Sequence, residues 1–204
     1  MNASLFRRSM RSAPPPGDLT RNDRFAELLV VALAVAALIL GLSLRQQSAN
    51  QTWRYENREA GVEASYPAGW LVDERGDYVV RIRDPYARPF KTQYQIRIIP
   101  AGGQTSIRNV LDGLTLQRST DLAAYRVFSV DEVPVGGAML TQMSFAFVDA
   151  DPNPFIQRLP VVVRGMDVVI RDGDRAIVVT YMAAEDVFEE NRAAFERFLA
   201  SLRY

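Results

Sequence analysis

Hydrophobic residues follow three patterns along the chain, and the first is one unbroken apolar run. Residues 25–44 read FAELLVVALAVAALILGLSL, with Glu27 as the one charged side chain. A helix of about 20 residues spans roughly 30 Å, which matches the hydrocarbon core of a bilayer. The run therefore predicts a transmembrane helix at 25–44. Its anchor residues include Phe25, Leu28, Leu33, Leu38 and Leu44.

The segments that flank the apolar run predict its orientation. Residues 1–24 carry five arginines and two aspartates, a net charge of +3, whereas the chain from residue 52 onward has 18 basic and 21 acidic side chains. Short positive flanks stay cytoplasmic. We therefore predict a disordered cytoplasmic tail at 1–24, a stalk at 45–51 and an extracytoplasmic domain at 52–204, all held at the cell membrane by a single pass.

A cleaved signal peptide is the alternative to an uncleaved anchor. The small residues at Gln47-Ser48-Ala49 offer a weak cleavage site. Against cleavage, the region before the apolar run is long, and the run exceeds the core of a typical signal peptide. These lengths favour an anchor that stays in the mature protein.

From Trp53 the apolar positions recur at every second residue, which is typical of strands with one buried face. Residues 62–66, 78–83 and 94–98 each alternate in this way. The segment 84–90 between the last two contains two prolines, which lack the amide hydrogen that a ladder requires, so it is predicted to be a loop.

Strand patterns return in the second half of the chain. Residues 125–133 and 137–148 are predicted to form an antiparallel pair joined by a glycine-containing turn. Residues 160–171 and 176–182 flank an Asp-Gly pair, which is a strong hairpin signal. Because these last two strands are apolar on both faces, we expect them at the centre of the sheet.

Two segments have helical spacing. Apolar residues between 107 and 114 share one face, with Thr105 or Ser106 placed to cap the helix. Together with about six to seven strands, the two helices predict an α+β fold in which an antiparallel sheet is flanked by helices. The closing amphipathic helix carries the stripe Val187, Phe188, Asn191, Phe195, Phe198 and Leu202.

Two missing residue types restrict the chemistry. The chain has no cysteine and no histidine, which excludes disulfides, thiol nucleophiles and serine-histidine-acid catalysis. The 24 basic residues balance the 24 acidic ones, which argues against a nucleic-acid partner held by bulk electrostatics. We predict no catalytic residues, no metal site and no cofactor.

Candidate partner-binding residues come from two stretches. Trp70 with Tyr66 forms either an aromatic ligand shelf or the edge of a core. The loop 84–90 offers Tyr86, Arg88 and Phe90, residue types that are enriched at interface hot spots, although a solvated loop is the simpler interpretation. We select Trp70, Tyr86, Arg88 and Phe90 as candidates for contact with a partner.

Two acidic clusters are weaker candidates. Residues 149–154 space three oxygen side chains as calcium loops do, but Pro154 stands where the loop glycine is needed, so a proline-rich turn is predicted. Asp172 and Asp174 have the separation of a carboxylate pair, which the hairpin already explains.

Two stretches resemble a known family. Tyr66-Pro67-Ala68-Gly69-Trp70 is similar to the Tyr-Pro-x-Gly-Trp element of PsbP-like domains, and residues 174–181 with 188–203 resemble the closing strand and helix of that family. The resemblance implies a PsbP-type α/β/α sandwich over 53–204 in a bacterial membrane-anchored protein. It also implies a mostly non-enzymatic role in binding partners or assembling membrane complexes.

The leading functional hypothesis is a single-pass, membrane-anchored extracytoplasmic binding domain. It would serve a protein partner as a non-catalytic accessory or assembly subunit of an envelope or energy-transducing complex. The alternative is a carrier of a small hydrophobic ligand or lipid, which a pocket lined by Met139, Met143 and Phe145 would favour. An envelope hydrolase that uses Asp172 and Asp174 is the least favoured.

Overall fold

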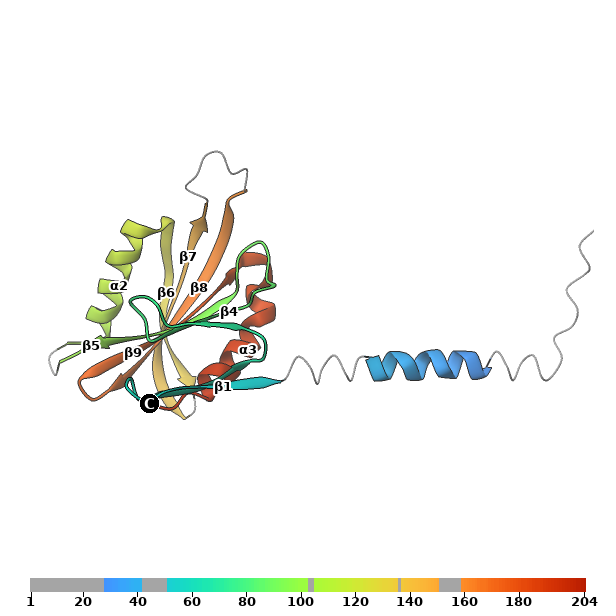
Figure 1. Cartoon of the computed structure of the whole chain (residues 1–204). Coiled ribbons are helices and arrows are strands. Elements are labelled where there is room, and N and C mark those ends of the chain that lie inside the picture. Colours follow the sequence, from blue (N-terminus) through green and yellow to red (C-terminus); the bar gives the residue numbers. More distant parts are fainter. Residues whose placement is uncertain (1–27, 42–50, 103–104, 136, 151–158) are drawn as a thin grey trace, which may run out of the picture. The chain divides into compact units, whose positions relative to one another are not determined.

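The computed structural model describes residues 28–41, 51–102, 105–135, 137–150 and 159–204 (Figure 1). The predicted tail, most of the predicted stalk and most of the acidic stretch 149–154 lie outside the described residues. The chain divides into two compact units, Met1–Ser48 and Ala49–Tyr204.

The first unit contains a helix over residues 28–41, and Leu28, Leu33 and Leu38 on it are exposed. Within the part of the chain that the structure describes, no helix has both the length and the hydropathy that a membrane crossing requires. The predicted span runs from Phe25 to Leu44, so both of its ends lie outside the described residues. Membrane anchoring therefore stays a prediction.

The second unit is built on an antiparallel sheet of seven strands in the order β3-β4-β5-β9-β8-β7-β6, beside a separate two-stranded sheet of β1 and β2. The two strands predicted to be apolar on both faces are β8 and β9, which lie in the interior of this sheet, so their predicted central position is confirmed. The strands are β1 (Thr52–Asn57), β2 (Val62–Pro67), β3 (Leu71–Asp73), β4 (Val80–Arg83), β5 (Gln93–Pro100), β6 (Ala123–Val135), β7 (Ala138–Asp149), β8 (Val161–Asp172) and β9 (Arg175–Ala184).

Helices cover both faces of the sheet. Helix α2 (Ile107–Asp121) lies on one face and α3 (Phe188–Ala200), preceded by the short 3-10 helix η1 (Glu185–Val187), lies on the other (Figure 1). The β1–β2 hairpin packs on the α3 side, where its apolar residues join the same core. The predicted α+β sandwich is confirmed for this unit.

Local sequence signals set the element boundaries. The side chain of Ser106 accepts a hydrogen bond from the Asn109 backbone N–H at 3.1 Å, so Ser106 is the residue that caps α2. The predicted hairpin is also confirmed, but its two-residue turn is Gly173-Asp174 rather than Asp172-Gly173, because Asp172 belongs to β8 and pairs with Arg175. Gly173 has φ +58° there, a conformation that residues with a Cβ rarely adopt.

The core between the sheet and α3 is a stack of aromatic rings. The ring centroid of Tyr181 lies 4.7 Å from that of Phe188 and 5.1 Å from that of Phe195, and Tyr94 lies 4.8 Å from Phe198. The three phenylalanines fall on the stripe predicted for the closing helix. The Tyr181 hydroxyl donates to the carbonyl oxygen of Phe188 at 2.8 Å, which fixes the start of α3 on the sheet.

The core between the sheet and α2 depends on a glycine. Val110, Leu111 and Leu114 of α2 are buried against β7, β8 and β9. Gly165 of β8 lies opposite Phe145 of β7, and a Cβ at position 165 would overlap the Phe145 ring. The absence of a side chain at Gly165 thus makes room for the Phe145 ring.

We expect Gly165→Ala to lower the free energy of unfolding by about 1–3 kcal/mol, the usual cost of overpacking a core. Urea unfolding monitored by tryptophan fluorescence measures the change. Gly113→Ala in α2 is the control, since a Cβ there meets nothing within 4 Å and a helical alanine gains up to about 1 kcal/mol over glycine. A Gly165→Ala protein as stable as the wild type would contradict the packing described.

Candidate functional site

The structure places Trp70 in the core between the sheet and α3. Its ring is half-buried and lies 4.7 Å from that of Tyr94. Tyr66 instead meets Trp53 edge-on at 6.3 Å. Trp70 and Tyr66 therefore form no shelf together, and Trp70 closes an edge of the core.

The other three predicted partner residues lie in or next to the loop between β4 and β5. Tyr86 is 86% exposed, and Arg88 is exposed with its Nη1 donating to the carbonyl oxygens of Pro85 and Ala87. Phe90 packs in the core on the α2 side of the sheet, edge-on to Phe147 at 6.2 Å. Trp70 and Phe90 thus belong to opposite faces of the sheet, and the four residues do not form one surface.

A line of polar side chains crosses the sheet on the face that α2 covers. Asp73, Arg81, Gln95, Thr180 and Asp167 occupy paired positions on β3, β4, β5, β9 and β8, each directly opposite the next. Residues opposite each other in a ladder project to the same face. We call these five residues the polar row. Helix α2 covers the β8–β9 end of the polar row, and a cleft opens at the β4–β5 end of the row.

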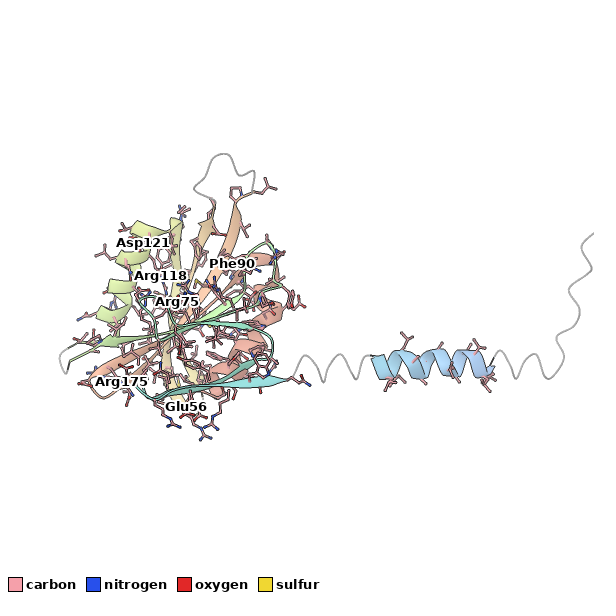
Figure 2. The ribbon with its side chains drawn as sticks, viewed as in Figure 1. Glu56, Arg75, Phe90, Arg118, Asp121 and Arg175 are labelled. Carbon is pink, nitrogen blue, oxygen red and sulfur yellow. The ribbon has the colours of Figure 1, made fainter. Side chains whose placement is uncertain are left out.

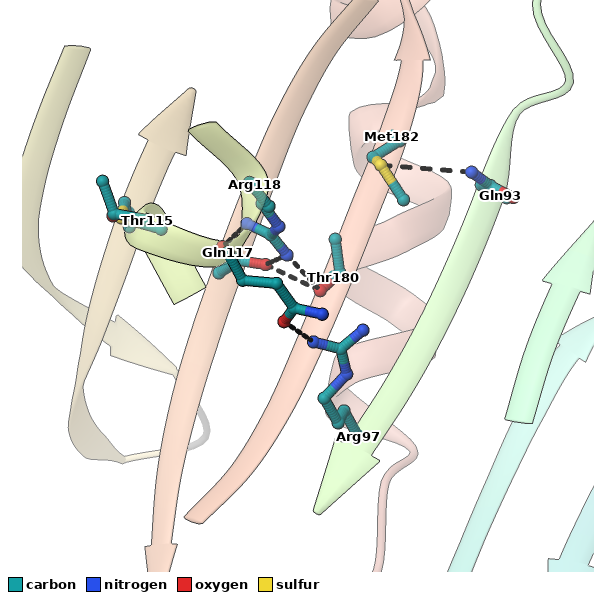
Figure 3. Close-up of polar contacts among 9 residues, drawn as sticks. Gln93, Arg97, Thr115, Gln117, Arg118, Thr180 and Met182 are labelled. Atoms are coloured by element: carbon teal, nitrogen blue, oxygen red, sulfur yellow. Dashed lines mark hydrogen bonds and ion pairs between the residues drawn. The ribbon is translucent and has the colours of Figure 1, made fainter. Parts of the chain in front are cut away.

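At the β8–β9 end, α2 contributes Arg118 (Figure 3). Asp167 is fully buried, and its carboxylate accepts hydrogen bonds from both terminal nitrogens of Arg118. The Nη2 atom lies 2.9 Å from Oδ1. The Thr180 hydroxyl donates to the same Oδ1 at 2.6 Å. The Arg118 guanidinium also lies 4.3 Å from the centre of the Phe145 ring. This buried ion pair joins the last turns of α2 to the middle of the sheet.

The charge states in this cluster follow from its surroundings. Burial opposes the charge on Arg118, but the adjacent Asp167 carboxylate outweighs it and raises the pKa of Arg118 above its ordinary value. Burial also raises the pKa of Tyr125 nearby, although the charge of Arg118 acts in the opposite direction. At neutral pH Arg118 stays charged and Tyr125 neutral, so the cluster acts as a structural ion pair.

At the β4–β5 end, a cleft of about 370 Å³ lies beside the C-terminal half of α2. Arg81 and Gln95 of the polar row line its floor, and Phe90, Phe147 and Met182 supply an apolar wall. We call this space the row cleft. Phe90 is labelled in Figure 2, and Met182 is labelled in Figure 3 with the polar groups near it. The Gln93 amide nitrogen lies 3.9 Å from the Met182 sulfur.

One buried donor in the row cleft, on Arg81, has no protein acceptor among the described residues. Gln95, beside it, is 7% exposed and also lines the cleft. Arg81 has no carboxylate within ion-pair distance in the described part of the chain, and its buried Nε has no partner. Arg97 differs in having a carboxylate partner, because it pairs with Asp77 at 2.8 Å, although its Nε is likewise buried without a partner. Buried donors without partners are rare in native proteins and indicate a place for an acceptor.

Arg81 and Gln95 are not among the site residues predicted from the sequence. The alternation in 78–83 and 94–98 does put arginine and glutamine on the wetter face of each strand. That pattern alone does not say which wet positions are buried or which lie opposite each other. Within the described residues, no group of three or more acidic side chains is placed to hold a metal ion.

A second, less polar cavity lies on the other side of α2. It has a volume of about 550 Å³, and Leu111, Val127, Val130 and Met143 are among its lining residues. Of the three residues that would favour a hydrophobic carrier, only Met143 lines it. Met139 is 61% exposed, and Phe145 is buried in the core on the α2 side.

Solved structures share this architecture at low sequence identity. Cyanobacterial PsbP (CyanoP) from Synechocystis sp. is 14% identical with a TM-score of 0.52, and the match covers 74% of this chain and 91% of that one. LpqN of Mycobacterium tuberculosis, a protein involved in cell envelope biogenesis, is 14% identical with a TM-score of 0.47 over 74% of this chain and 89% of that one. No family model and no curated protein matches the chain. The domain therefore has the PsbP-like fold.

Proposed function

We propose that the chain is a membrane-anchored extracytoplasmic binding domain, a non-catalytic accessory or assembly subunit of an envelope or energy-transducing membrane complex. The observation that carries the proposal is the row cleft, where Arg81 and Gln95 are partly or largely buried and still have donors to offer. A site that binds a ligand without reacting with it is typically a pocket with an apolar wall and a few fixed polar groups.

The two donors on the floor of the cleft are groups that bind rather than catalyse. Arginine and glutamine donate hydrogen bonds, and neither acts as a general base at neutral pH. The strongest charge pair, Arg118 with Asp167, is saturated by its own contacts. The PsbP-like fold supports the proposal in a general way, since CyanoP and LpqN carry the same architecture.

The predicted anchor would contribute to binding through effective concentration. A domain held on a short stalk meets a membrane partner at a high local concentration, so that a weak contact is sufficient. Partner binding should then weaken when the chain is cut within residues 47–50, while the released domain stays folded.

Affinity purification of the full chain tests the proposal. A tag after Tyr204, which is 52% exposed, leaves the Glu63–Arg203 backbone pairing intact. After solubilisation of the native membranes in a mild detergent, we expect a larger species on a native gel that contains a membrane or envelope protein at constant ratio. The chain cut at 47–50 is the control and should retain less partner. Migration of the full chain only as a lone monomer would contradict the proposal.

A carrier of a small hydrophobic ligand is the second candidate. It is favoured by the cavity between α2 and the β6–β7 pair, where Leu111, Val127 and Val130 lie next to Met143. Native mass spectrometry of the detergent-released protein would reveal a bound lipid as an added mass. An unmodified mass in every preparation would count against the carrier.

A further inference from the structure

We propose that the row cleft binds a carboxylate carried on a short apolar stem, with Arg81 and Gln95 as its hydrogen-bond donors. This inference rests on the proposed binding function and names the ligand chemistry of the same site. Either a small organic acid or the acidic side chain of a partner polypeptide can supply such a group.

The two donors lie side by side. Arg81 and Gln95 are directly paired across the β4–β5 ladder, which puts their Cβ atoms about 4.5–5.5 Å apart on one face. Both line the cleft. A guanidinium and an amide at this spacing can donate to the two oxygens of one carboxylate. The same acceptor would also receive a hydrogen bond from the Gln95 amide.

The ring of Tyr78 holds the Arg81 side chain in position. The Arg81 guanidinium carbon lies 4.2 Å from the centre of the Tyr78 ring. The Tyr78 hydroxyl is held in turn, at 3.0 Å from Oδ2 of Asp73 and 2.6 Å from the carbonyl oxygen of Arg75. Stacking on an anchored ring limits the rotamers of Arg81, so little freedom is lost when a carboxylate binds.

The charges around the cleft disfavour a ligand that carries two negative charges. Arg97 is neutralised by Asp77 and Arg118 by Asp167, which leaves Arg81 as the cation without a carboxylate partner in the described lining. Asp121 at the end of α2 and Asp149 at the end of β7 also line the cleft. They would repel a phosphate dianion more strongly than a carboxylate.

The apolar wall is the reason that the proposed carboxylate ligand should have an apolar stem. Phe90 and Phe147 meet edge-on, and Met182 lies across from Gln93 on the next strand. All three border the same cleft as the donors. A group with two or three methylenes ending in a carboxylate can contact the wall while its oxygens reach Arg81 and Gln95.

The test uses the full chain in a non-ionic detergent and ligand-observed saturation-transfer NMR, which detects weak binding. The probes are butyrate, its neutral isostere butyramide, inorganic phosphate, and a capped tripeptide with a central glutamate or glutamine. We expect butyrate to bind with a Kd of about 1 mM, and butyramide and phosphate to bind at least about tenfold more weakly.

Three variants locate the binding. Arg81→Gln should weaken butyrate binding at least about tenfold, and Gln95→Leu, which keeps the volume but removes the amide, should weaken it several-fold. Arg54→Gln is the matched control. Arg54 also lies on a strand, is paired with Glu63 at 2.6 Å and does not line the cleft. Its butyrate affinity should equal that of the wild type.

The outcomes are distinct. A glutamate peptide that binds more tightly than butyrate, with the glutamine peptide silent, supports a polypeptide as the source of the carboxylate. Butyrate binding without peptide binding supports a small acid. Equal binding of butyrate and butyramide, or equal losses in Arg81→Gln and Arg54→Gln, would overturn the inference. If no carboxylate binds while the tagged chain still captures its partner, the cleft inference fails and the proposed function stands.

Discussion

Replacing Asp167 with alanine is expected to lower the free energy of unfolding by about 3–5 kcal/mol, the cost of leaving a buried charge without its partner. The Asp167 side chain is fully buried and that of Arg118 is 14% exposed, so water cannot replace the lost carboxylate. Thr180 would also lose the acceptor of its hydroxyl. Urea unfolding followed by circular dichroism at neutral pH measures the loss.

A double variant distinguishes the effect of the unpaired Arg118 charge on stability from the effect of the lost packing. Arg118→Met with Asp167→Leu removes both charges and keeps apolar volume, and such replacements are often neutral or stabilising. We expect the double variant to recover most of the stability lost in Asp167→Ala. If the double variant were as unstable as the single one, packing around Asp167 rather than the unpaired charge of Arg118 would explain the loss.

Phe195→Ala is expected to cost about 3–5 kcal/mol of unfolding free energy, as removal of a buried aromatic ring does. Phe195 is 1% exposed and has ring neighbours on three sides, with centroids 5.1 Å from Tyr181, 5.5 Å from Tyr94 and 6.3 Å from Phe198. The substitution leaves a cavity in the middle of this stack, which the fixed sheet cannot close.

Leu116→Ala is the control for this prediction. Leu116 is also on a helix, but it is 72% exposed, so its removal should change the unfolding free energy by less than about 0.5 kcal/mol. Thermal and urea unfolding of both variants are the measurements. A Phe195→Ala protein no less stable than Leu116→Ala would show that the aromatic stack contributes little to holding α3 on the sheet.

The fold was largely predictable because its signals are local. The Asp172-Gly173 pair specifies a hairpin within four residues, and two-sided apolar strands can only be satisfied at the centre of a sheet. Ser106 caps α2 through a hydrogen bond to a residue three positions away. The closing helix was equally visible, since its stripe of Phe188, Phe195 and Phe198 repeats at helical spacing.

The site was not predictable because its contacts are not local. Arg118 and Asp167 are 49 positions apart in the chain, and their pairing requires α2 to lie over β8. The partnership of Arg81 with Gln95 depends on the register of β4 against β5, in which a shift by one residue would turn one of them to the opposite face. Loop composition also does not distinguish the exposed Tyr86 from Phe90, which packs against Phe147 and borders the row cleft.

One signal of the buried cluster was nevertheless present in the sequence. Asp167 is a single acidic residue within the otherwise apolar run from Met166 to Ile170 in the predicted central strand. A carboxylate at such a position needs a buried cation. The pattern therefore indicates that a partner exists, although only the folded chain identifies it as Arg118.

The β1–β2 hairpin has a mechanical consequence. It is a separate two-stranded sheet, and the end of the chain is joined to it, because Glu63 and Arg203 exchange backbone hydrogen bonds of 2.9 and 2.8 Å. A pulling force applied through the residues before Thr52 would load this small ladder before it reached the seven-stranded sheet.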